Sequence, residues 1–147
     1  MSLPDDTAHH TAIRVAVPAR FAFERLSDAR FVGGWSLGSM ALEPAGDGMF
    51  RGRSLFDGSD AFVEIRPDPA HGLIDFAVGS RETRVPRIWI RVAPGGPLGF
   101  AEDSCVVGMG ALRAATTPDA AWARTRTTHE TEILLIKAQL ETQWAAR

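Results

Sequence analysis

The chain has 147 residues, of which 45% are hydrophobic and 23% charged, values that fit one globular domain spanning residues 1–147. Its formal net charge of −2 argues against nucleic acid as a partner, because phosphate binding favours a basic surface. No apolar run approaches the roughly 20 residues of a membrane-spanning helix, so we expect no membrane insertion. Cys105 is the only cysteine, which favours the reducing cytoplasm. Residues 1–8 are expected to be a flexible start.

The first elements predicted are a strand and two short helices. Thr11 to Val17 alternates between apolar and polar residues, which indicates a half-buried strand. Pro18 ends that strand and suits the first turn of a helix over Ala19 to Leu26. Asp28 can cap a second short helix over Ala29 to Trp35. The pair His9 and His10 precedes the strand, and an exposed strand start is favoured there over metal binding.

Six more strands and a long helix follow. The strands are separated by short turns rich in Gly, Pro and Asp, so neighbours should pair antiparallel. They are expected at Ser39 to Glu43, Met49 to Phe56, Ala61 to Arg66, Gly72 to Val78, Arg84 to Val92 and Ser104 to Leu112. The last element, Pro118 to Trp144, has an apolar stripe with helical spacing, formed by Trp122, His129, Ile133, Ile136, Leu140 and Trp144.

Three short segments resemble one known superfamily. Residues 17–23, VPARFAF, are similar to its entry into the first helix, and Leu26-Ser27-Asp28 followed by Trp35 is similar to the next segment. Residues 63–69, VEIRPDP, resemble its central strand and turn. Together with the element order, these segments resemble the SRPBCC superfamily, which includes START domains and polyketide cyclase/dehydrase proteins, over about residues 9 to 145.

The resemblance implies an α+β helix-grip fold, in which a seven-stranded curved antiparallel sheet wraps around the C-terminal helix over an apolar cavity. Two short helices follow the first strand and close one end of that cavity. If the apolar strand faces point inward, the lining carries no carboxylate. The expected ligand-binding residues are Trp35, Val63, Ile65, Phe76, Ile88, Ile90, Met109, Thr125, His129, Ile133 and Ile136.

His129 is the candidate catalytic residue because an imidazole in an apolar stripe stays neutral and can accept a proton. Thr125, one turn earlier, is its only obvious local partner, and Glu130 and Glu132 are expected to point elsewhere. The alternative is a structural histidine whose ring bonds to a backbone carbonyl or water, as most buried polar groups do.

Two arginine groups have alternative interpretations. Arg87, Trp89 and Arg91 share one face of a strand, which we expect to be the outer face of the sheet, although it can also serve as an interaction surface. Arg51 or Arg53 can instead enter the cavity and pair with an anionic ligand group, because both faces of their strand are apolar.

The sequence favours binding of a small hydrophobic or amphipathic molecule, such as a lipid, steroid or polyketide-like compound. A polyketide cyclase or dehydratase using His129 as acid and base is the alternative enzyme, and a protein-interaction module is the third hypothesis. No cofactor and no metal site is expected, because the four histidines and one cysteine have no metal-ligand spacing. The sequence is compatible with either a monomer or a homodimer.

Overall fold

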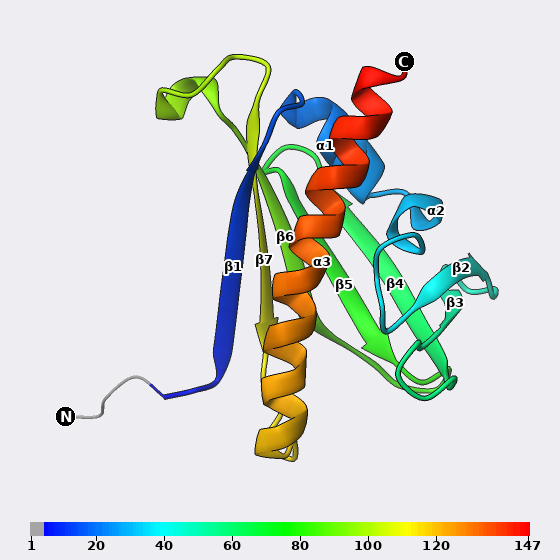
Figure 1. The fold of residues 1–147 in the computed structure, drawn as a ribbon. Coiled ribbons are helices and arrows are strands. Elements are labelled where there is room, and N and C mark those ends of the chain that lie inside the picture. Colours follow the sequence, from blue (N-terminus) through cyan, green and yellow to red (C-terminus); the bar gives the residue numbers. More distant parts are fainter. Residues whose placement is uncertain (1–4) are drawn as a thin grey trace.

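The computed structural model describes residues 5–147. Seven strands in this range form one antiparallel sheet in the order β1-β7-β6-β5-β4-β3-β2. Figure 1 shows the sheet curving around the long helix α3, which lies along one face, with the short helices at its C-terminal end. The strands are β1 Ala8–Val15, β2 Met40–Pro44, β3 Phe50–Arg53, β4 Asp60–Asp68, β5 Leu73–Gly79, β6 Arg84–Pro94 and β7 Cys105–Leu112. The helices are α1 Ala19–Leu26, α2 Ala29–Val32, the short 3₁₀ helix η1 Gly96–Leu98, and α3 Asp119–Ala145.

The predicted fold class is therefore confirmed: α+β, with a curved antiparallel sheet, two short helices after the first strand, and a long terminal helix. The expected flexible start at residues 1–8 lies partly outside the described residues, and Ala8 already belongs to β1. The second helix is shorter than predicted, because Gly33 and Gly34 end it after Val32.

Strand β4 continues through Pro67 to Asp68, where the sequence predicted a break. Pro67 pairs with Ile74 of β5, whereas β3 covers β4 only as far as Val63. The far side of β4 is thus a free edge at Pro67, and an edge strand tolerates the missing backbone N–H of proline.

Helix α3 is held against the sheet by its apolar stripe and by two polar contacts. Ile133, Ile136 and Leu140 are buried in the core that forms between α3 and the inner face of the sheet. Near the C-terminal end of β1, the Glu141 carboxylate accepts a bond from the Ala16 backbone N–H at 2.7 Å. The Lys137 ammonium donates to the Arg14 carbonyl at 2.7 Å. These contacts fix the rotation of α3, and with it the direction of the side chains one or two turns earlier.

Candidate functional site

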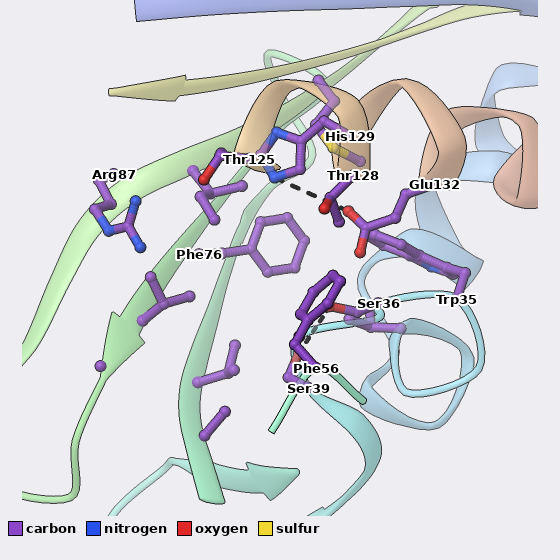
Figure 2. Close-up of a pocket in the computed structure, with 18 of the residues that line it drawn as sticks. Trp35, Ser36, Ser39, Phe56, Phe76, Arg87, Thr125, Thr128, His129 and Glu132 are labelled. Atoms are coloured by element: carbon purple, nitrogen blue, oxygen red, sulfur yellow. Dashed lines mark hydrogen bonds and ion pairs between the residues drawn. The ribbon is translucent and has the colours of Figure 1, made fainter. Parts of the chain in front are cut away.

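A cavity of about 300 Å³ lies between α3, the inner face of the sheet and the turn after α2. Its apolar wall comes from α2 and its following turn and from strands β4 to β7. This wall consists of Val32, Trp35, Val63, Phe76, Val78, Ile88 and Met109. Polar side chains lie on α3, on the turn after α2 and at single positions of β4 and β6. They are Ser36, Ser39, Asp60, Arg87, Arg124, Thr125, Thr128, His129 and Glu132, most of which are labelled in Figure 2. The cavity is thus apolar on the sheet side and polar along α3.

His129 lies within the apolar stripe of α3 and is only 5% exposed. Its Nδ1 lies 2.9 Å from Nε2 of His9, a hydrogen bond in which either ring can be the donor. Burial is the main cause that lowers the pKa of His129 to about 4, and the positive charges of His9 and Arg87 contribute to this shift. The imidazole is therefore neutral at neutral pH, with Nδ1 already bonded and Nε2 left for a partner in the cavity.

His9 is the hydrogen-bond partner of His129, and its exposure was predicted wrongly. It lies in β1 opposite Ala111 of β7 and is 7% exposed. Its ring packs edge-to-face with that of Trp122, with the two ring centres 5.4 Å apart. Burial is the largest cause that lowers its pKa, followed by the charge of Arg126. Ile13 and Val15 point inward, and counting back in steps of two residues along the strand reaches His9. This spacing was the signal in the sequence that His9 is buried.

Glu132 brings a carboxyl group into the interior, and the prediction of a lining without carboxylates is wrong. It is 4% exposed, and its Oε2 accepts a hydrogen bond from the Leu37 backbone N–H at 2.7 Å. Its Oε1 lies 3.9 Å from Nε2 of His129. Burial raises the pKa of Glu132 to about 7, against the opposing effect of the Leu37 bond. Its position three residues after His129 and four before Ile136 was the signal for this inward direction.

Thr125 lines the cavity, but it is not the partner that the sequence suggested for His129. Its hydroxyl donates to the Ala121 carbonyl one turn earlier, at 3.1 Å. The partner comes instead from β1, more than a hundred residues away in the chain, through His9. Local spacing along a helix cannot reveal such a contact.

Arg87 enters the cavity because strand β6 contains a bulge. The register passes from Phe76 opposite Ile88 to Ala77 opposite Pro86, so Arg87 is an extra residue in β6. A bulge redirects the side chain next to it, and both Arg87 and Ile88 line the cavity. The predicted shared face of Arg87, Trp89 and Arg91 is therefore wrong. Trp89 lies on the outer face of the sheet over Gly110, where a Cβ would meet its ring at 2.1 Å.

The structure brings together seven of the predicted ligand-binding residues. The cavity is lined by Trp35, Val63, Phe76, Ile88, Met109, Thr125 and His129. The other predicted residues belong to the core behind it or pack against that core: Ile65, Ile90, Ile133 and Ile136. Contact of the lining residues with a ligand stays a prediction. Arg51 and Arg53 are exposed and do not reach the cavity.

Trp35 forms part of the wall at the end of the short-helix pair. It is 4% exposed, and its indole Nε1–H has no hydrogen-bond partner among residues 5–147. The neighbouring turn brings in the hydroxyls of Ser36 and Ser39, which lie 2.7 Å apart. Ser36 and Ser39 could not be predicted as cavity residues, because positions in a turn follow no periodic pattern. Thr128, which was also not predicted, lies in α3 three residues after Thr125.

Other chemistry-bearing groups lie away from the cavity. Cys105 is a buried free thiol, and burial raises its pKa to about 11, so it is protonated and unreactive at neutral pH. Across the described part of the chain, no group of three or more His, Cys, Asp or Glu side chains is placed to hold a metal ion. In the same part, no helix has both the length and the apolarity that crossing a membrane requires.

No protein-family model and no curated protein sequence matches the chain. Its fold is nevertheless similar to many solved structures. The aromatase/cyclase Zhui from a Streptomyces species has a TM-score of 0.64 at 17% identity, covering 91% of this chain and 93% of that one. The Aha1 dimer from Colwellia psychrerythraea has a TM-score of 0.67 at 14% identity, covering 92% and 97%. A START superfamily protein from Mycobacterium smegmatis has a TM-score of 0.61 at 12% identity, covering 92% and 99%.

At these identities the likeness shows the fold alone. The chain has the START-like helix-grip fold that its sequence resemblance to the SRPBCC superfamily predicted. What the cavity binds must be argued from its own residues.

Proposed function

We propose that this protein binds a small amphipathic molecule in the cavity between α3 and the sheet. The observation that carries the proposal is the division of the cavity into an apolar wall on the sheet side and the buried His129–Glu132 pair on α3. Apolar walls with a few fixed polar groups are typical of small-molecule sites, and the volume is at the lower end of their usual range of roughly 300–1,000 Å³.

The His129–Glu132 pair suits an uncharged oxygen of the ligand. Nε2 of His129 and Oε1 of Glu132 are 3.9 Å apart, too far for a direct hydrogen bond. One carbonyl or hydroxyl oxygen can lie about 2.8 Å from both atoms. His129 is neutral at neutral pH, and Glu132 holds a proton about half of the time at pH 7. In this protonated form the pair can donate to such an oxygen without a buried charge. The unpartnered indole N–H of Trp35 supports the same view, because a buried donor is normally satisfied.

The experiment is a thermal-unfolding screen with sterols, flavonoids, long-chain alcohols and polyketide-like aromatic compounds. A bound compound raises the melting temperature through linkage. Val78→Trp should abolish the rise, because residue 78 lines the cavity while still partly exposed, so an indole fills the space without entering the packed core. Leu73→Trp, on the same strand and 38% exposed, is the matched control and should keep the rise. If no compound raises the melting temperature of the unmodified protein, the proposal fails.

Proton transfer is the second candidate function. It is favoured by the buried row of His9, His129 and Glu132, in which a hydrogen bond joins the two histidines and Glu132 lies 3.9 Å from His129. Here His129 takes a proton from carbon or oxygen of a bound carbonyl compound, and Glu132 bonds to the carbonyl oxygen, as in a cyclase or dehydratase. His9 fixes the ring of His129 through the 2.9 Å bond. The test is deuterium exchange into the α-carbon of a long-chain ketone. His129→Asn should stop enzyme-dependent exchange and leave binding within about twofold. Equal loss of binding and exchange would indicate a structural role.

The remaining expectations are a cytoplasmic location and a homodimer. The buried thiol of the single Cys105 supports a reducing compartment. The similarity to the dimeric Aha1 structure supports the homodimer. Sedimentation equilibrium measures the mass of the particle in solution directly. A monomer mass would remove this expectation without affecting ligand binding.

A further inference from the structure

Arg87 is a half-buried cation in the cavity wall with nothing to pair with. Within residues 5–147 its guanidinium makes no hydrogen bond and no ion pair. Arg84, three residues earlier on the same strand, shows the usual arrangement: its Nε donates to Glu64 at 3.0 Å, and another nitrogen donates to the Ser80 carbonyl at 3.1 Å. A half-buried guanidinium whose five donors bond to no protein group in the described range can donate to an acceptor on a bound molecule.

The bulge is what brings this cation inside. Without the extra residue, alternation along β6 would leave position 87 on the outer face with Trp89 and Arg91. Pro86, immediately before it, cannot donate to the β-ladder, which makes the bulge easier to form at this point. Bulges occur often beside functional sites, where they redirect a side chain.

The other charged groups around the cavity leave this positive charge unbalanced. Figure 2 shows Arg87 and Glu132 on either side of Phe76. Glu132 accepts a hydrogen bond from the Leu37 N–H, whereas Arg87 lines the cavity without a protein partner among residues 5–147. Asp60 is exposed at the rim, and Arg124, also at the rim, adds a second positive charge with its guanidinium 5.1 Å from the Phe56 ring centre. Burial raises the pKa of Glu132 to about 7, so at pH 7 this carboxyl carries only about half of a negative charge, and its hydrogen bond goes to Leu37 and not to Arg87.

We propose that the natural ligand is an organic anion, a small amphipathic carboxylate whose charged end lies at Arg87 and whose apolar body lies against Phe76 and the surrounding wall. A carboxylate matches the planar fork of a guanidinium with two parallel hydrogen bonds. This inference rests on the proposed ligand-binding function and specifies the class of ligand.

The test compares octanoate with octan-1-ol, which share a chain and differ in charge, by calorimetric titration at one ionic strength. Unmodified protein should bind octanoate about tenfold or more tightly than octan-1-ol, the expected gain from charge-assisted hydrogen bonds. Arg87→Gln should remove this preference, with octan-1-ol affinity changed by less than about twofold. Arg87→Lys keeps the charge without the fork and should keep part of the preference.

Arg91→Gln is the matched control, an exposed arginine on the outer face of the same strand, and it should leave both affinities unchanged. Equal affinity of the unmodified protein for both probes would overturn the inference while leaving ligand binding intact, and this result does not depend on any variant folding. Equal weakening of both probes by Arg87→Gln would also overturn it. Failure of the unmodified protein to bind either probe would count against the proposed function itself.

Discussion

Glu132 and His129 are two ionisable side chains in one buried wall, and their pKa values are shifted in opposite directions. Burial disfavours the charged form of each, so it raises the pKa of the carboxyl to about 7 and lowers that of the imidazole to about 4. At neutral pH the imidazole is uncharged and the carboxyl is close to its midpoint. The pair therefore combines a proton donor with a proton acceptor, and its average charge at pH 7 is about half of one negative charge.

The two shifts act on stability in opposite directions. Between about pH 4.5 and 7 the folded protein keeps a proton on Glu132 that the unfolded chain has released, so this group's stabilisation is lost as pH rises. Between about pH 4 and 6.5 the unfolded chain binds a proton at His129 that the folded protein does not, so stability rises with pH. The contributions largely cancel over most of this window, and the unmodified protein should show a weak dependence there.

Replacing Glu132 separates the two contributions. Glu132→Gln keeps an acceptor for the Leu37 N–H and removes the titration. From pH 4 to pH 8 the unfolding free energy of the variant should therefore rise relative to the unmodified protein by about 3 kcal/mol. Urea unfolding across this range measures the difference in unfolding free energy between variant and unmodified protein. Glu130→Gln, at an exposed neighbouring position on α3, is the control, and its difference should stay constant with pH. A constant difference for Glu132→Gln as well would mean that the carboxyl titrates normally.

At the scale of elements, the cavity depends on how closely α2 approaches β2. Gly33 follows α2, and its carbonyl accepts a bond from the Ala41 N–H at 2.9 Å. A Cβ at position 33 would lie 2.6 Å from the Leu42 backbone nitrogen. The contact is with backbone and cannot be relieved by a rotamer change, so only glycine allows this approach. The turn that follows supplies Trp35 and Ser36 to the cavity wall.

Gly33→Ala should therefore push α2 away from β2 and disturb the cavity. We expect a loss of about 1–3 kcal/mol in unfolding free energy, as for other overpacked sites, together with weaker binding of octan-1-ol. Gly38→Ala is the control, because a Cβ there meets no atom within 4 Å, and its stability should change by less than about 1 kcal/mol. Equal stability of both variants in urea unfolding would show that the α2–β2 contact is not tight.

At the scale of the whole molecule, the order and kind of the elements could be predicted from the sequence because the signals were local. Alternating strands, short turns and the stripe of α3 gave the topology, and the resemblance gave the helix-grip arrangement. The polar residues of the site were harder to predict from the sequence. Residue spacing indicates that His9 and Glu132 point inward. We predicted exposed positions for them because charged residues and residues near a terminus are usually exposed. The position of Arg87 was not accessible, because a one-residue bulge reverses the alternation and leaves no periodic signal.

The central claim, that the cavity binds an amphipathic molecule, is tested most directly by methyl NMR. Among the described residues, Met109 lines the cavity, whereas Met49 is buried elsewhere and Met40 lies in β2 outside it. Titration of octan-1-ol into protein with labelled methionine methyl groups should shift the Met109 signal saturably, with the Met49 and Met40 signals unchanged. A Met109 signal that does not move at saturating octan-1-ol, or one that moves no more than Met49, would contradict the claim.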